Sequence, residues 1–228
     1  HKKKVFFFNY EHMNTIVERY NKIKSNILFL KPIKPVNIIA VSKTFTLTQI
    51  RPLVDHGHTH FGENKVQEAT SKWSEIKKDK KINLHMVGRL QSNKAREAVK
   101  LFDYIHSLDN QKLADTLSKN QINENKNLKY FIQVNIQNEN QKSGISVNEL
   151  DAFYNYCTKE INLDILGLMI IPPNDNNPKK YFQYLNELNK SLALNDLSMG
   201  MSADYIEAVN NESTFVRIGS LIFGARSK

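Results

Sequence analysis

The sequence has little cysteine and no long apolar run, and both shortages narrow the class of protein. Cys157 is the one cysteine among 228 residues, so neither an intramolecular disulfide nor a zinc site built from several cysteines can form. No run approaches the ~18 consecutive apolar residues that a membrane-spanning helix needs. A reducing compartment therefore fits best, and we expect a cytoplasmic protein without a membrane partner.

The sequence also lacks the tracts that usually separate domains. No internal repeat, low-complexity tract or linker rich in Pro, Gly or Ser divides the chain. Its length suits one large domain, and a single α/β barrel commonly needs about this many residues. We therefore expect one domain over residues 14–228, preceded by an irregular N-terminal extension over residues 1–13. The apolar run within that extension is too short for a signal peptide.

Basic residues exceed acidic ones, and the formal net charge is +9. Such an excess is compatible with RNA or an anionic lipid as a partner. The lysines are spread along the whole chain, however, and only residues 77–81 form a block, which we interpret as a solvated helix end. Aromatic-rich motifs typical of RNA-binding sheets are missing from the sequence. Nucleic acid is therefore not an expected partner.

What the sequence does contain is a regular alternation of short apolar segments with helix-like segments. The apolar segments have strand composition, and the segments after them place apolar residues at helical spacing. Eight such pairs are what a closed (β/α)8 barrel requires, whereas an open sheet needs fewer. We therefore predict an α/β protein that forms a single (β/α)8 TIM barrel. The predicted strands are 37–44, 58–62, 83–88, 102–108, 128–136, 161–171, 196–199 and 214–218, and the main predicted helices are 14–30, 46–56, 94–101, 110–119, 147–160, 179–194 and 204–210.

Lys43 stands at the carboxyl end of the first predicted strand. In barrels and sheets built from β-then-α units this end carries the chemistry, because the loops that leave it converge on one face. Burying an unpaired ammonium is costly, and desolvation favours the neutral amine, which is the form that attacks a carbonyl. Lys43 is therefore a candidate for forming a Schiff base. The alternative is an ordinary solvated lysine in a loop.

Two stretches near the end of the chain combine small residues with predicted helix starts. One is Ser-Met-Gly-Met-Ser-Ala-Asp at 198–204, and the other is Arg-Ile-Gly-Ser-Leu-Ile-Phe-Gly at 217–224. Both follow the last two predicted strands, where barrel enzymes often build a phosphate site. Each stretch alone is also typical of a simple turn. Together with Lys43 they predict a site for a phosphorylated aldehyde.

His58 and His60 are two residues apart on a predicted strand and would point to the same face. Two histidines in this arrangement can begin a metal site, but the sequence places no third ligand convincingly. We therefore interpret both residues as structural, and we predict no metal.

Five motifs then resemble those of the pyridoxal 5′-phosphate homeostasis proteins of the YggS/PROSC type. They occur in the same order, and the resemblance as a whole spans roughly residues 14–226. The motifs are Ala-Val-Ser-Lys-Thr at 40–44, Phe-Gly-Glu-Asn-Lys-Val-Gln-Glu at 61–68, His-Met-Val-Gly-Arg-Leu-Gln-Ser-Asn-Lys at 85–94, Leu-Ser-Met-Gly-Met-Ser at 197–202, and Val-Arg-Ile-Gly-Ser at 216–220 with Gly-Ala-Arg at 224–226.

This resemblance implies a barrel like the N-terminal domain of alanine racemase, with pyridoxal 5′-phosphate (PLP) as its cofactor. Lys43 matches the lysine that forms the internal aldimine, and Arg217 matches the arginine that faces the pyridine nitrogen. Asn64 matches a position near the cofactor. Ser220 stands where threonine is common, which keeps the hydroxyl group. The phosphate-binding positions of the family match Ser202, Gly219 and Ser220.

The resemblance also implies a role in intracellular PLP, or vitamin B6, homeostasis. An arginine beside the pyridine nitrogen disfavours protonation there and so weakens the ring as an electron sink. In the racemases a second acid/base group comes from an extra β-domain and the dimer partner; here we expect no such domain after the barrel and a cofactor open to solvent. We therefore predict a monomeric, non-catalytic PLP carrier that holds PLP on Lys43, with apoenzymes that require PLP as further partners. The alternative is a PLP-dependent amino-acid racemase of low activity.

Overall fold

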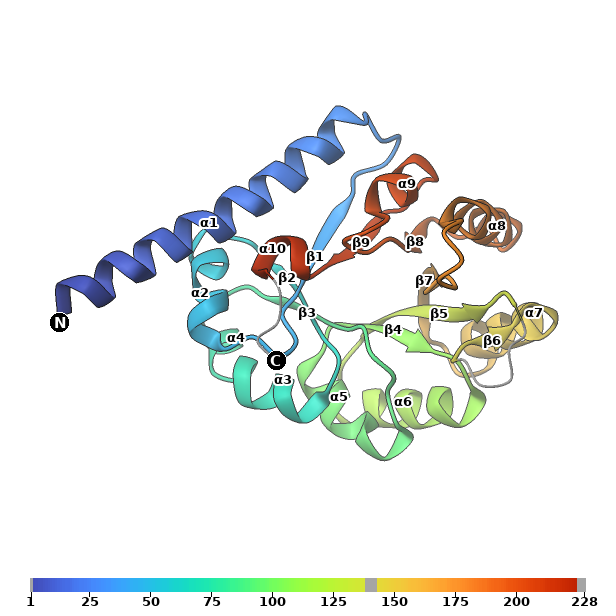
Figure 1. Cartoon of the computed structure of the whole chain (residues 1–228). Helices are drawn as coiled ribbons and strands as arrows, with labels where there is room; N and C mark the ends of the chain where they lie inside the picture. Colours follow the sequence, from blue (N-terminus) through green and yellow to red (C-terminus); the bar gives the residue numbers. More distant parts are fainter. Residues whose placement is uncertain (1, 138–142, 225–228) are drawn as a thin grey trace.

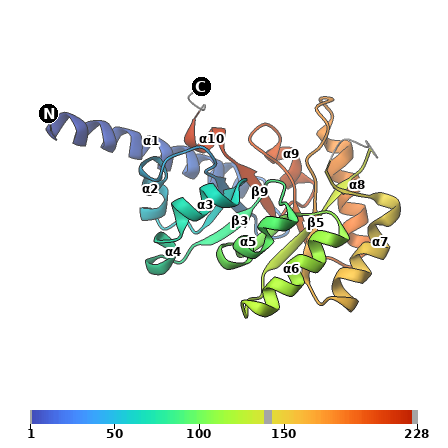
Figure 2. The same cartoon turned by 90° about the horizontal axis from the view of Figure 1, so that it is seen from below.

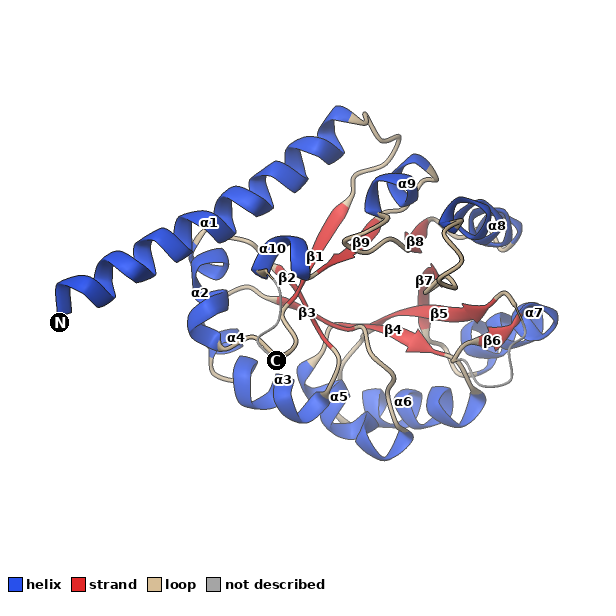
Figure 3. Cartoon of the chain, viewed as in Figure 1, coloured by secondary structure: helices blue, strands red, loops and turns tan. Residues whose placement is uncertain are grey.

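A computed structural model describes residues 2–137 and 143–224 of the chain. Within these residues eight parallel strands close into a ring, and helices surround it (Figures 1 and 3). Contacts between β4 and β5 complete the closure. In ring order the strands are β1 (Asn37–Val41), β2 (His60–Glu63), β3 (Asn83–Met86), β4 (Tyr104–Leu108), β5 (Lys129–Asn135), β7 (Asp164–Met169), β8 (Asp196–Ser198) and β9 (Phe215–Ile218). The predicted single (β/α)8 barrel is confirmed.

Helical segments follow the strands and cover the outside of the ring. They are α2 (Leu47–Asp55), α3 (Val66–Trp73), α4 (Ile76–Asp79), α5 (Ala95–Leu101), α6 (Gln111–Asn123), α7 (Val147–Asn155), α8 (Pro178–Ser191), α9 (Tyr205–Asn210) and α10 (Ser220–Phe223), with a short 3-10 turn at Ser92–Lys94 and a π-helical turn at Tyr156–Glu160. A two-residue strand, β6 (Ile145–Ser146), pairs with the end of β5 outside the ring.

Helix α1 (Lys2–Phe29) begins well before the predicted start of the first helix. Residues 2–13, which we expected to be irregular, continue this helix, and α1 extends beyond the other helices (Figure 2). The physical reason is that residues 2–29 contain neither Pro nor Gly, the two residues that most strongly interrupt a helix. The chain leaves the helical conformation at Lys31, whose φ is +48°. A domain boundary near residue 13 stays a prediction.

The strands are buried on both faces, which explains their nearly continuous apolar composition. In β1, Ile38 and Ala40 pack into the large core between strands and helices, whereas Ile39 and Val41 face the inside of the barrel. The inside of the barrel is lined by a smaller apolar cluster of Ile39, Val41, Tyr104, Phe131, Met169 and Phe215. The barrel is thus a packed core, and ligands must bind at its ends.

No helix in the part of the chain that the structure describes has both the length and the apolar character needed to cross a membrane.

Candidate functional site

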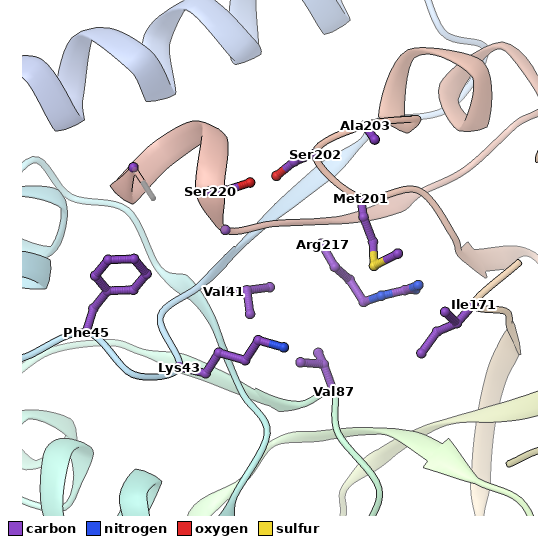
Figure 4. Close-up of a pocket in the computed structure, with 12 residues that line it drawn as sticks. Val41, Lys43, Phe45, Val87, Ile171, Met201, Ser202, Ala203, Arg217 and Ser220 are labelled. Atoms are coloured by element: carbon purple, nitrogen blue, oxygen red, sulfur yellow. The ribbon is translucent and has the colours of Figure 1, made fainter. Parts of the chain in front are cut away.

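A cavity of about 330 Å³ opens where the strands end. The residues that line it lie near the carboxyl ends of five strands, β1, β3, β7, β8 and β9, or in the loops that follow them. Lys43 and Arg217 point into it from different sides, and Ser202 and Ser220 lie together at another side (Figure 4). Gly219 also lines it. Five of the six residues predicted from the sequence are therefore brought together at the carboxyl ends of the strands.

Lys43 follows β1 by two residues, and hydrogen bonds hold the backbone on both sides of it. On one side, the ammonium of Lys72 donates to the carbonyl of Ser42 over 2.8 Å. On the other side, the amide of Thr44 donates to a carboxylate oxygen of Glu68 over 2.6 Å. Thr44 has a φ of +69°, a conformation that is uncommon for a β-branched residue. The loop after β1 is thus fixed by α3, and the Lys43 side chain extends from this fixed base.

Beneath this loop lies Glu63, a fully buried carboxylate at the end of β2. One of its oxygens accepts hydrogen bonds from the Ser42 hydroxyl at 2.6 Å, from Lys72 at 2.9 Å and from the Trp73 indole at 2.9 Å. Lys72 is itself only 7% exposed, so the ion pair is buried. A buried pair of this kind is costly to break because the remaining charge would lose its partner. The motif at 61–68 therefore supports Lys43 through its acidic residues, a role that our sequence analysis did not assign.

Arg217 lies on β9 and is only 5% exposed. Its guanidinium donates three hydrogen bonds of 2.7 Å, two to the carbonyl and hydroxyl of Ser198 and one to the carbonyl of Ile170. Burial lowers the pKa of Arg217 to about 10, so the group stays cationic at neutral pH. Among the residues described, no carboxylate lies within ion-pair distance of it. A buried cation held only by neutral groups is suited to an acceptor atom supplied by a ligand.

The loops after β8 and β9 meet beside the cavity, where Ser202 and Ser220 lie together (Figure 4). The hydroxyl of Ser202 accepts a hydrogen bond from the amide of Leu221 at 3.4 Å, which joins the two loops. The first turn of α10 presents amide groups that have no partner within the helix. A Cβ atom at Gly219 would lie 3.2 Å from the carbonyl oxygen of Val41, so this position has little room for a side chain. Small residues thus leave room here for an anionic group.

Asn64 does not line this cavity. It lines a neighbouring cavity of about 340 Å³, together with Lys65, Arg89 and Lys94. Its side-chain oxygen is buried and has no hydrogen-bond partner among the described residues. A contact between Asn64 and a cofactor therefore stays a prediction.

The two histidines considered as metal ligands lie at the opposite end of the barrel. His58 makes hydrogen bonds with the Tyr20 hydroxyl at 3.1 Å and the His60 carbonyl at 2.8 Å. His60 contacts His85 through its Nδ1 atom. Over residues 2–137 and 143–224, no group of three or more His, Cys, Asp or Glu side chains is placed to hold a metal ion.

The fold and site define a class of protein: (β/α)8 barrels with a lysine after the first strand and small residues after the last two. The family model described as "Alanine racemase, N-terminal domain" matches residues 19–227. The chain is 37% identical over 229 residues to the pyridoxal phosphate homeostasis protein of Vibrio alginolyticus, covering 96% of both chains. It is 38% identical over 198 residues to the protein of the same name in Aquifex aeolicus, covering 83% of this chain and 86% of that one. The chain belongs to the family of pyridoxal phosphate homeostasis proteins.

Solved structures agree with this assignment. PipY of Synechococcus elongatus PCC7942, solved with PLP bound, is 33% identical with a TM-score of 0.82, covering 92% of this chain and 100% of that one. Alanine racemase from Corynebacterium glutamicum has a TM-score of 0.69 at 13% identity, covering 95% of this chain and 62% of that one. The second likeness shows a shared barrel fold.

Proposed function

We propose that the chain binds PLP in the cavity at the carboxyl ends of its strands and serves PLP homeostasis, holding PLP as a Schiff base on Lys43. The observation that carries this proposal is that a lysine and a buried arginine, which has no carboxylate partner among the described residues, converge on one cavity beside a group of small residues. The names of the relatives and the PLP bound in PipY support it. These residues match the three chemical parts of PLP, which are an aldehyde, a phosphate and a pyridine nitrogen.

Each part of the site has a distinct task. Lys43 supplies the amine that condenses with the aldehyde, with loss of one water molecule. The Ser202 and Ser220 hydroxyls and the backbone at Gly219 hold the phosphate. Arg217 donates a hydrogen bond to the pyridine nitrogen, and its positive charge disfavours a proton there. PLP, when bound, supplies an electron sink for carbanions, and Arg217 weakens that property.

We further propose that the chain acts as a PLP carrier without ordinary turnover, and that apoenzymes which require PLP are its partners. The likeness to alanine racemases favours a second candidate, a PLP-dependent amino-acid racemase of low activity. Exchange of the α-proton of several amino acids in deuterated water separates the two. Turnover comparable to ordinary PLP enzymes that is abolished by Lys43→Ala would overturn the carrier proposal.

The binding proposal is tested by mixing the protein with PLP, reducing with borohydride and mapping the labelled peptide. We expect a visible absorbance band that is lost on reduction, with the label on Lys43. Lys43→Arg should abolish the band, and Lys65→Arg, which changes a lysine of the neighbouring cavity, should keep it. Labels spread over surface lysines, with no change in Lys43→Arg, would contradict the proposal.

A further inference from the structure

Hydrogen-bonded side chains form a column through the inside of the barrel, from its N-terminal end to Arg217. His60 Nδ1 lies 2.9 Å from His85 Nε2, and His85 Nδ1 lies 2.9 Å from His106 Nε2. His106 Nδ1 lies 2.7 Å from the hydroxyl of Ser198, which in turn accepts from Arg217 at 2.7 Å. We name His60, His85, His106 and Ser198 the histidine column.

The stagger of the strands explains why these residues meet. His60 on β2 is opposite Asn83, so His85 lies two residues further along β3. His85 is opposite Tyr104, so His106 lies two residues further along β4. Side chains two residues apart on a strand share a face. Each step therefore stays inside the barrel and moves toward the end where the strands meet the cavity.

The guanidinium of Arg217 fixes the direction of every hydrogen bond in the column. A guanidinium can only donate, so the Ser198 hydroxyl accepts from it and uses its own hydrogen to reach His106 Nδ1. His106 Nδ1 is then an acceptor, and the ring carries its hydrogen on Nε2. The same reasoning places the hydrogens of His85 and His60 on Nε2. In the reverse arrangement Ser198 would accept twice and its buried hydrogen would have no partner, which is unfavourable.

The surroundings favour neutral rings, as this arrangement requires. His85 and His106 are fully buried; His85 stacks on Tyr104 at 4.2 Å, and His106 stacks on Phe131 at 4.5 Å. Burial lowers the pKa of His85 and of His106 well below the usual range; the neighbouring histidines and Lys77 add to the shift of His85, and Arg217 adds to that of His106. A neutral imidazole has one donor and one acceptor, so three in a row satisfy one another.

We propose that His85, His106 and Ser198 are positioning residues for Arg217, holding its guanidinium toward the cavity, while Arg217 in return fixes all three histidines in the Nε2–H form. The effect on a cofactor rests on the proposed function, because it requires that Arg217 contacts PLP. The fixed direction of the hydrogen bonds does not depend on PLP or on the proposed function. His60 lines a cavity at the N-terminal end of the barrel, so the column connects that end to the PLP site.

The first test needs no PLP. Two-bond 1H–15N spectra of uniformly labelled protein at neutral pH distinguish the two forms of a histidine ring. We expect His85 and His106 to carry hydrogen on Nε2 alone, with assignment from the spectra of His85→Gln and His106→Gln. Hydrogen on Nδ1 of His106 would overturn the proposal.

The second test asks whether the column acts on the bound cofactor. His106→Phe keeps the stacked ring but removes both hydrogen bonds, and we expect PLP to dissociate about tenfold faster on dilution, with a shifted visible band. His106→Gln, which has both a donor and an acceptor, should restore much of the effect. The matched control is His58→Phe, a buried histidine outside the column, which should release PLP at the wild-type rate.

If His106→Phe does not fold, Ser198→Ala takes its place in this test, because it removes only a single oxygen. Equal release rates and identical spectra for wild type and Ser198→Ala would overturn the positioning role. If wild type itself takes up no PLP, the proposed function fails, and the ring spectra still decide whether the hydrogen bonds run as described.

Discussion

Ser202 and Ser220 contribute two hydroxyl groups to one side of the cavity, and these hydroxyls can be tested apart from the rest of the site. Ser220→Ala removes one hydroxyl from the proposed phosphate cradle. We expect the affinity for PLP to fall about tenfold, because a hydrogen bond to a charged group contributes about 1.5 kcal/mol. Affinity for pyridoxal, which has the same aldehyde but no phosphate, should not change. Titrations followed by visible absorbance measure both constants.

The conservative control at this position is Ser220→Thr, which keeps the hydroxyl and should bind PLP within about twofold of wild type. An equal loss of affinity for PLP and pyridoxal in Ser220→Ala would show that the serine does not contact the phosphate.

The sequence predicts the location of some site residues and not the contacts of others. Lys43, Arg217 and Gly219 follow or end apolar strands within recognisable motifs, so their place at the cavity could be predicted. The link from His85 to His106 could not, because it depends on the stagger of strands separated by long helical segments. The available signal was a buried histidine within each of two strands that are otherwise largely apolar.

At the scale of elements, helix α3 holds the loop that carries Lys43. Its residue Lys72 bridges the buried carboxylate of Glu63 and the carbonyl of Ser42. We expect Lys72→Met to lower the free energy of unfolding by about 3 kcal/mol, because Glu63 would remain buried without its partner. It should also weaken PLP binding, since the base of Lys43 would loosen. Urea denaturation and PLP titration measure the two effects.

Lys78→Met provides the matched control, since Lys78 pairs with Glu75 on the protein surface and both side chains are more than half exposed. An exposed pair contributes little, so the free energy of unfolding should change by less than about 0.5 kcal/mol. Similar stabilities for the two variants would contradict the supporting role of Lys72.

The strands could be predicted from the sequence because burial on both faces requires apolar residues. The strands read as apolar runs because both of their faces are covered, and all eight were found, although β1 ends at Val41 rather than at residue 44. The two-residue β6 is too short to leave a periodic signal. Lys77, expected in a solvated helix end, instead lies half-buried, donates to the Leu101 carbonyl at 2.8 Å and pairs with Asp103. That contact depends on a neighbouring βα unit, which local sequence cannot show.

For the whole molecule, a ligand that binds only the folded chain must stabilise it. With PLP at about 100 times its dissociation constant, we expect the free energy of unfolding to rise by about 2.7 kcal/mol. The same addition to Lys43→Ala should have a much smaller effect. Thermal denaturation with and without PLP measures this, and stabilisation that is equal in both proteins would place PLP elsewhere on the chain.

The buried histidines make the stability of the whole molecule depend on pH. Burial lowers the pKa of His58 from 6.5 to about 4, and it lowers the pKa values of His85 and His106 as well. Below pH 6.5 the unfolded chain therefore binds protons that the folded chain does not. Stability is fully present above that pH and falls as the pH drops toward the folded pKa values, by up to about 1.4 kcal/mol per pH unit for each histidine.

We therefore expect the free energy of unfolding, measured by urea denaturation, to fall by several kcal/mol between pH 7 and pH 5, a large part of the stability of an ordinary domain. His58→Gln should reduce the slope of the free energy of unfolding against pH by about the contribution of one histidine, which is up to about 1.4 kcal/mol per pH unit. Tyr20→Phe, which removes the hydroxyl beside His58 but keeps the titrating ring, should leave the steepness nearly unchanged. A flat profile in wild type, or the same slope in His58→Gln, would show that these rings do not resist protonation in the fold.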